Sequence, residues 1–258
     1  MAAPVLITGA TGLIGSWVVR HWTDADPPLH VVRRSDVDLL APGAAADLVR
    51  RTRPAAVVHL AWVASGTPGY RGSPDNDRWL TTSLDLHDVC RQLRVPLWAT
   101  GTVVDTDPDP ADAYTASKVA LRRQLDPAIA DGAIGWLRPA YVFDERVGRP
   151  AVVAAALAAR SDGDTVTLQT PDAAHDFVHA SDVGAAVVAA VRNGRTGYLP
   201  VGSGRVRRVA DLVSALGVSW RRGADAPAVS HAEAPVDVGW LHDLGWHPTT
   251  TEEFFADD

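Results

Sequence analysis

The chain of 258 residues is poor in several features, and each shortage excludes a class of protein. It has one cysteine, Cys90, so no disulfide can form within the chain, and a reducing compartment is expected. No apolar run approaches the length of about 18 residues that a membrane-spanning helix needs. No basic segment precedes the apolar stretch near the N-terminus. We therefore expect a cytoplasmic protein that does not interact with a membrane.

Positive charge is also scarce, since 24 lysine and arginine residues face 31 acidic ones and the net charge is -7. Proteins that bind nucleic acid concentrate basic residues against the phosphates, so no nucleic-acid partner is expected. No grouping of cysteine and histidine has the spacing of a zinc site. His175 and His179 flank Asp-Phe-Val in a segment typical of a strand, so no metal is expected there either.

Lysine is the rarest charged residue: Lys118 is the only one, and the other 23 basic residues are arginine. It follows Tyr114 by four residues in the segment Asp-Ala-Tyr-Thr-Ala-Ser-Lys. An ammonium is a compact charge on a flexible stem, whereas a guanidinium is a rigid fork, so the two are not interchangeable at a site that needs a focused charge. Tyr114 and Lys118 are either neighbours on an exposed helix face or a chemically active pair.

Short β-rich runs alternate with longer amphipathic ones in the first half of the chain, which indicates βαβ units on a doubly wound parallel sheet. Strands are expected at 5–8, 29–34, 37–39, 55–60, 96–100 and 133–137. Helices are expected at 12–22, 44–53, 75–93 and 114–125. After Pro139 the alternation decays, with helices expected at 151–160, 182–192 and 209–216. The break predicts a second, smaller lobe.

Glycines follow the first expected strand, in Thr8-Gly-Ala-Thr-Gly-Leu-Ile-Gly15. At a strand-to-helix turn, glycines allow the backbone to approach a diphosphate closely, which is the arrangement of Rossmann dinucleotide-binding domains. The residues expected to contact the cofactor here are Gly9, Thr11, Gly12, Leu13 and Ile14.

Arg33 and Arg34 close the second expected strand, where an acidic residue usually meets a free ribose 2′-hydroxyl. A guanidinium suits a 2′-phosphate instead, so NADP(H) is favoured over NAD(H). Asp38 and Leu39 follow at a spacing suited to the adenine ring. The alternative, two solvated arginines in an arginine-rich chain, stays open.

These motifs together resemble the extended short-chain dehydrogenase/reductase family, the NAD-dependent epimerase/dehydratase group. The resemblance runs along almost the whole chain. It includes the glycine motif, Tyr114-x-x-x-Lys118, Val58-His-Leu-Ala61, Leu137-Arg-Pro139, Asp176-Phe-Val-His-Ala-Ser-Asp182, Val201-Gly-Ser-Gly204 and Leu244-Gly-Trp-His-Pro248.

The resemblance implies a Rossmann domain for NADP(H) at 1–139, to which later segments can return, and a mainly substrate-binding α/β lobe at 140–258. It implies that Thr100, with Thr102 as the second choice, Tyr114 and Lys118 are catalytic. Lys118 is expected to lower the pKa of Tyr114 and to bind the nicotinamide ribose. Leu60, Ala61, Trp62 and Pro139 complete the expected cofactor contacts.

Three residues narrow the activity within the family. Gly101 and Thr102 stand where dehydratases carry an acid pair, and Cys90 falls in a helix rather than beside a sugar ring as in double epimerases. The leading interpretation is NADPH-dependent reduction of the 4-keto group of a nucleoside-diphosphate 4-keto-6-deoxy sugar. Three alternatives remain. The protein is an NAD-dependent 4-epimerase, an NADP(H)-sensing regulatory protein, or a reductase of a small ketone or aldehyde, which the short second lobe suggests.

The substrate side is harder to predict. Ser65, Tyr70, Thr102, Arg146, Arg149 and His175 are the candidate contacts. His175 stands where the family has arginine and Asp144 where it has glycine, which weakens the transfer of roles. By resemblance, the helices expected at 75–93 and 114–125 would pair two copies into a homodimer.

Overall fold

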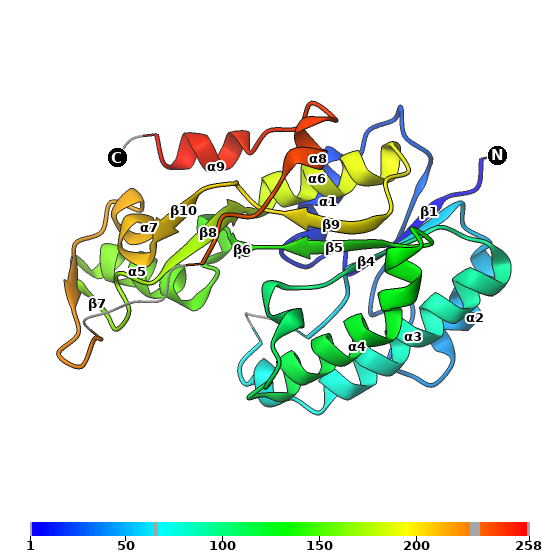
Figure 1. Cartoon of the computed structure of the whole chain (residues 1–258), viewed down its shortest axis with the longest axis horizontal. Helices are drawn as coiled ribbons and strands as arrows, with labels where there is room; N and C mark the ends of the chain where they lie inside the picture. The colour runs from blue at the N-terminus through cyan, green and yellow to red at the C-terminus, as the bar shows by residue number, and fades with distance from the viewer. Residues whose placement is uncertain (1, 64–66, 228–232, 257–258) are drawn as a thin grey trace. The chain divides into compact units, whose positions relative to one another are not determined.

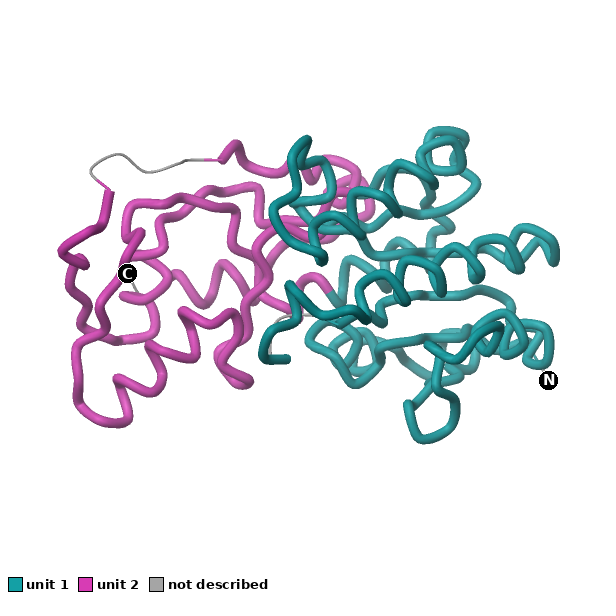
Figure 2. The backbone as a smooth tube through the Cα atoms, turned by 90° about the horizontal axis from the view of Figure 1, so that it is seen from below, with its two compact units in different colours: residues 1–138, 184–199 teal, residues 139–183, 200–258 magenta. Residues whose placement is uncertain are grey.

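A computed structural model describes residues 2–63, 67–227 and 233–256. The chain forms two compact units, drawn in different colours in Figure 2. Residues 1–138 and 184–199 make the first, and residues 139–183 and 200–258 make the second. The chain therefore leaves the first unit at Arg138 and returns to it once.

The first unit is built on a six-stranded sheet (Figure 1). Its order is β2 (Leu29–Val32), β1 (Val5–Thr8), β3 (Ala56–His59), β4 (Leu97–Thr100), β5 (Gly135–Pro139) and β9 (Gly197–Val201). The neighbours from β2 to β5 pair in parallel. Strand order reverses at β1, with β2 on one side and β3 on the other, and ligands bind at such a point in doubly wound sheets. The expected fold class is confirmed.

Helices cover both faces of this sheet. In Figure 1, α2 (Ala44–Thr52), α3 (Asp75–Leu93) and α4 (Ala113–Ala130) lie on one face, and α1 (Gly15–His21) and α6 (Ala180–Arg192) on the other. Gly184 of α6 lets that helix approach α1, because a Cβ there would lie 2.6 Å from the Cβ of Trp17. Among the described residues, no helix has the length and apolar character to cross a membrane.

The core of the first unit explains why α4 faces the sheet. Leu121, Leu125 and Ile129 recur every four residues along α4, and all three are buried. They pack in one cluster with Trp136, and burying each large apolar side chain contributes about 1.5–3 kcal/mol. Cys90 of α3 belongs to the same core, and burial raises the pKa of its thiol to about 12, as expected for a cysteine without chemical function.

The second unit holds two small sheets. One has the order β10 (Val206–Arg208), β8 (Ala174–His179), β6 (Tyr141–Phe143), and the other pairs β11 (Trp220–Arg222) with β7 (Val166–Leu168). Its helices are α5 (Ala151–Asp162), α7 (Val209–Ala215), α8 (Gly239–His242) and α9 (Thr249–Phe254). The expected helices at 151–160 and 209–216 and the extended form of 175–179 are confirmed.

Two local predictions are wrong. Residues 37–39 form no strand, because the chain turns after β2 through a hydrogen bond from Val37 N to Arg33 O. Leu39 reaches the core from this turn and is 8% exposed. The first helix begins at Gly15 rather than at residue 12, because the glycine-rich segment before it forms turns.

Candidate functional site

A cavity of about 370 Å³ opens in the first unit, where the carboxyl ends of β1, β2 and β3 meet. Its wall contains most of the residues predicted to hold a cofactor: Gly9, Thr11, Gly12, Arg33, Arg34, Asp38, Leu39, Leu60, Ala61 and Trp62. Among the described lining residues, Leu13 and Ile14 do not appear, and Pro139 belongs to the second unit. Sequence reasoning missed other residues of the wall, including Thr67, Asp75 and Trp79.

The glycines of the first turn are required by close contacts. Gly9 has φ +72°, and a Cβ there would lie 2.6 Å from Ala61 N. A Cβ on Gly15 would lie 2.1 Å from Gly9 O. At Gly12 a Cβ would lie 3.1 Å from Gly9 O and within 4 Å of no other heavy atom of the described residues, and this glycine lines the cavity. This is a cradle that a side chain would fill, and it fits a dinucleotide diphosphate.

Arg33 and Arg34 reach the cavity from the turn after β2. The carboxylate of Asp36 accepts a hydrogen bond from Arg33 N at 3.3 Å and fixes this turn. Both arginines are exposed, and within the described part of the chain neither forms an ion pair. Their guanidinium N–H groups are therefore available to an anion bound in the cavity.

Lys118 is buried, with 3% of its surface exposed. Its Nζ donates to Thr100 O at 2.8 Å and lies 3.7 Å from the centre of the Trp62 ring, which lines the cavity. Burial lowers the pKa of the ammonium to about 7, and the Asp105 carboxylate opposes this shift only in part. The single lysine is therefore not on an exposed helix face.

Tyr114 lies one turn before Lys118 on α4. Burial raises the pKa of its phenol to about 12, while a hydrogen bond with the Thr102 side chain and the nearby Arg71 guanidinium lower it. The expected depression of this pKa by Lys118 is not what the structure shows. The Thr100 hydroxyl donates to His59 O at 3.3 Å, and the side chain whose hydrogen bond lowers the pKa of the Tyr114 phenol is that of Thr102.

Asp105, which sequence reasoning did not assign, anchors the loop after β4. It is fully buried and accepts hydrogen bonds from Arg138 Nε at 2.8 Å, Trp136 Nε1 at 3.0 Å and Thr102 N at 3.2 Å. Gly101 is required beside it, because a Cβ there would lie 2.4 Å from Asp105 Oδ2. The carboxylate thus positions Thr102 against Tyr114. An acidic residue shortly after a buried strand was the available signal.

His59, the last residue of β3, is hydrogen-bonded to Thr8, the last residue of β1. Ser83 Oγ donates to Trp79 O at 2.7 Å, so His59 Nε2 must carry the proton that it shares with Ser83 at 2.9 Å. Its Nδ1 then accepts from the Thr8 hydroxyl at 2.8 Å. Burial, and secondly the charge of Lys118, lowers the pKa of His59 to about 3. The ring is a neutral structural link.

The ring of Tyr70 also contacts Tyr114. It belongs to the 3₁₀ helix η1 (Tyr70–Gly72), and its ring meets the Tyr114 ring edge to face with 5.2 Å between centroids. The structure therefore brings two predicted substrate contacts, Tyr70 and Thr102, to the tyrosine. Ser65 lies outside the described residues.

The comparison with protein families decides the classification. The model of the NAD dependent epimerase/dehydratase family matches residues 5–200. The chain belongs to this family. It is an NAD(P)-dependent oxidoreductase of the extended short-chain dehydrogenase/reductase type, as its motifs predict.

Solved structures share the fold along nearly the whole chain. UDP-glucose 4-epimerase from Thermus thermophilus, in complex with NAD, is 24% identical, with a TM-score of 0.71 over 95% of this chain and 94% of that one. A GDP-mannoheptose C4 reductase from Campylobacter jejuni, with NADP bound, is 17% identical, with a TM-score of 0.72 over 96% and 93%. UDP-glucose 4-epimerase from Thermotoga maritima, with UDP-glucose, is 19% identical, with a TM-score of 0.74 over 98% and 96%. No curated protein matches the sequence significantly.

The remaining predicted substrate contacts, Arg146, Arg149 and His175, lie in the second unit. His175 stacks on Tyr141 with 3.9 Å between ring centroids. Its Nδ1 is 3.2 Å from Glu233 Oε1, close enough for an ion pair but not aligned for a hydrogen bond. Tyr141 donates to the same carboxylate oxygen at 2.8 Å. His175, which stands where the family has arginine, is thus part of a group of aromatic and acidic side chains.

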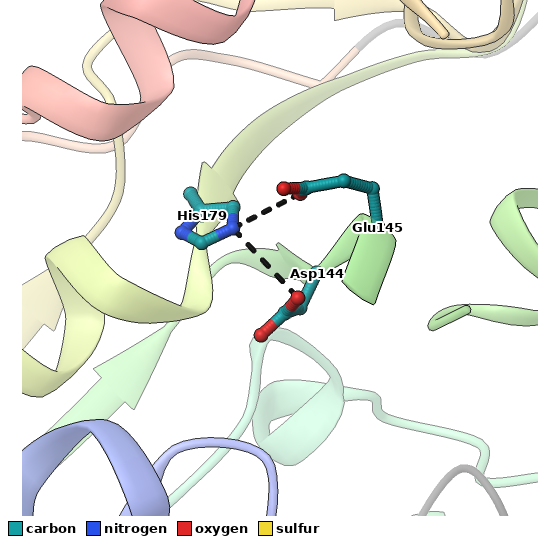
Figure 3. Close-up of side chains that lie close together, drawn as sticks. All are labelled: Asp144, Glu145 and His179. Atoms are coloured by element: carbon teal, nitrogen blue, oxygen red, sulfur yellow. Dashed lines mark hydrogen bonds and ion pairs between the residues drawn. The ribbon is translucent and has the colours of Figure 1, made fainter. Parts of the chain in front are cut away.

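Asp144, Glu145 and His179 form a cluster in the second unit (Figure 3), with ligand atoms within 4.8 Å of one another. His179 Nδ1 accepts from Ser181 N at 3.0 Å, so its proton is on Nε2, which donates to Glu145 Oε2 at 3.1 Å. A metal at Nε2 would need the ring proton on Nδ1, where Ser181 N already donates a hydrogen bond. The geometry is therefore that of a hydrogen-bonded cluster rather than a metal site.

Proposed function

We propose that this protein is an NADPH-dependent reductase of a keto group, acting on the 4-keto group of a nucleoside-diphosphate 4-keto-6-deoxy sugar, with Tyr114 as the general acid. The observation that carries the proposal is the cavity whose wall joins the glycine turn to Arg33 and Arg34. Family membership supports the oxidoreductase chemistry. The arginines support the choice of cofactor and, through it, the choice of a reductase.

The two arginines favour a phosphorylated cofactor, which a reductase exchanges after each turnover. Each guanidinium can bind the 2′-phosphate of NADPH through charged hydrogen bonds, whereas the 2′-hydroxyl of NADH gives it no anion to pair with. An epimerase must keep its NAD between two half-reactions. Among proteins with this fold, the Campylobacter jejuni reductase has NADP bound and the Thermus thermophilus epimerase has NAD, and Arg33 and Arg34 favour the first type.

The proposed chemistry uses the residues around Tyr114. NADPH, when bound, would supply the hydride for the carbonyl carbon, and the phenol of Tyr114 would donate its proton to the carbonyl oxygen, so that the ketone becomes an alcohol. Thr102 orients the phenol through their hydrogen bond. Lys118, whose pKa near 7 allows it to gain and lose a proton in neutral solution, returns a proton to the site. Thr100 holds the ammonium through its carbonyl oxygen.

The second unit is the proposed substrate-binding part. Arg146 and Arg149 are exposed or half-buried cations that suit a diphosphate, and His175 offers a ring beside Tyr141. A homodimer through α3 and α4 is proposed on the family resemblance.

The test is a screen of NADPH oxidation against 4-keto nucleotide sugars and simple ketones, with the wild-type protein, Tyr114→Phe and the control Tyr198→Phe. Tyr198 is 46% exposed and should tolerate the change. Tyr114→Phe should bind NADPH normally and lose about 10²–10⁴-fold in turnover, the usual contribution of a general acid.

Three results would contradict the proposal. Interconversion of UDP-glucose and UDP-galactose with retained NAD would indicate an epimerase. Turnover of small ketones alone would replace the substrate class. A protein that binds NADPH but shows no oxidoreductase activity, with or without Tyr114, would be a sensor.

A further inference from the structure

Arg71 lies at the junction of the two tyrosines described above. Its guanidinium carbon is 5.5 Å from the centre of the Tyr70 ring and 5.8 Å from the centre of the Tyr114 ring. Both distances are within the range of about 6 Å in which an aromatic ring attracts a cation. The two rings themselves meet edge to face. One arginine thus contacts both partners of the aromatic pair.

This position is fixed from the side of α4. Arg71 donates to Asp112 Oδ2 at 2.7 Å, while Asp112 Oδ1 accepts from Thr115 N at 2.9 Å and caps the helix. Tyr114 stands in the first turn after that cap. The guanidinium is therefore tied to the turn that carries the phenol.

The backbone next to Arg71 is also fixed, by a residue of α3. Asn76, which is fully buried, donates to Tyr70 O at 2.7 Å and to Ser73 O at 2.9 Å. Its carbonyl oxygen accepts from Trp62 Nε1 at 2.9 Å. These bonds hold the backbone beside Arg71 and the position of Tyr70, while half of the Arg71 side chain stays exposed.

We propose that Arg71 is a positioning residue for the proton-donating phenol: its guanidinium holds Tyr70 and Tyr114 in their arrangement and stabilises the phenolate that proton donation leaves. The charged groups that act on the Tyr114 phenol are Arg71 from η1 and Asp105 from the loop after β4, with Tyr70 as a second phenol. Asp112 and Lys118 belong to its own helix region. Lys118 has its ammonium engaged by Thr100 O and the Trp62 ring.

Lysine could not fill this role equally. The guanidinium pairs with a carboxylate through one edge while its plane lies near aromatic rings, whereas an ammonium offers no plane. The inference rests on the proposed function in naming Tyr114 as proton donor. The effect of Arg71 on the phenol exists in the protein without substrate and can be measured there.

The test is an NMR titration of protein labelled with ¹³C at the tyrosine Cζ, with the Tyr114 signal identified by Tyr114→Phe. At pH 11 the wild-type phenol, whose pKa is about 12, should be about one-tenth ionised. In Arg71→Gln its pKa should rise by about one unit, the lower end of the effect of an adjacent charge, so that ionisation falls about tenfold. Arg71→Lys should give an intermediate value.

Arg50→Gln is the matched control. Arg50 is 52% exposed and pairs with one carboxylate, as does Arg71, which is 51% exposed, but it lies on α2 away from Tyr114. It should leave the titration unchanged. Because Arg71 is half exposed, the difference between wild type and Arg71→Gln should shrink in about 1 M salt.

Turnover provides the second readout. Arg71→Gln should lower kcat and move the alkaline limb of its pH profile upward, without changing NADPH affinity. Identical titration of Tyr114 in the wild type and Arg71→Gln would overturn the inference. If the titration shifts as expected while every form lacks reductase activity, the positioning role stands and the proposed reaction fails.

Discussion

Burial of Lys118 should weaken folding at low pH, and replacing it with methionine should relieve that effect. The ammonium titrates near pH 7 in the folded chain, against an ordinary pKa of 10.5. A difference of about 3.5 units corresponds to roughly 5 kcal/mol, an order-of-magnitude figure for a side chain that is 3% exposed. This is a large share of the free energy of about 5–15 kcal/mol by which a folded domain is usually stable.

The sign follows from proton binding. Between pH 10.5 and pH 7 the unfolded chain binds the lysine proton and the folded chain does not, so the free energy of unfolding rises with pH across that window. Below pH 7 the full cost is present, and above pH 10.5 it vanishes. Lys118→Met removes this pH dependence. It also removes the hydrogen bond to Thr100 O and the contact with Trp62, at a cost of about 1–3 kcal/mol that does not depend on pH.

The variant should therefore be more stable than the wild type by roughly 2–4 kcal/mol at pH 6 and less stable by about 1–3 kcal/mol near pH 10.5. Urea unfolding followed by far-UV circular dichroism at the two pH values measures both differences. Arg50→Met, which removes an exposed cation paired with Asp47, should show the same small difference at both. If the stability difference of Lys118→Met is equal at pH 6 and near pH 10.5, the reasoning about the buried ammonium is refuted.

Three further predictions concern the cofactor site and the turn. Arg33→Asp should weaken NADPH binding about 10–100-fold without weakening NADH binding, because one charged hydrogen-bonding partner of the 2′-phosphate is lost. The fluorescence of the bound reduced cofactor measures both affinities. Thr102→Val should lower kcat by about 10²-fold while Thr100→Val keeps most activity, and the opposite order would return the hydroxyl role to Thr100. Gly15→Ala should lower the free energy of unfolding by about 1–3 kcal/mol, since its Cβ would meet Gly9 O. Gly72→Ala, whose Cβ would meet no atom of the described residues within 4 Å, should change it by less than about 0.5 kcal/mol, and equal effects in a denaturation assay would contradict this account.

Local pattern predicts most of the first unit because the periodicities are strong there. The long helix expected at 75–93 is α3 with the same bounds, and the strand expected at 5–8 is β1. The strand expected at 37–39 fails because the chain turns directly after β2, where Val37 N donates to Arg33 O, and a turn of this kind leaves no extended backbone for a ladder. The segment's apolar residues, among them Leu39, serve the core from a turn instead.

In the candidate site, too, a local pattern predicts some residues and misses others. Gly9 and Gly12 were recognisable because a strand-to-helix turn over a diphosphate imposes a local spacing of glycines. Arg71 was not, because its contact with Tyr114 joins segments 43 residues apart in sequence through Asp112, and no local spacing records it. Asp105 had a local signal, its place shortly after a buried strand, but its role depends on Arg138 of a neighbouring strand, which no local spacing records.

By itself, the amino-acid sequence determined the order of strands and helices, the glycine turn and the pairing of Tyr114 with the only lysine, because each depends on residues a few positions apart. Only the tertiary structure decided that the lysine is buried with a pKa near 7, that Thr102 contacts the phenol, and that the cation facing that phenol is an arginine. Burial and electrostatic fields are set by groups that folding brings together from distant parts of the chain.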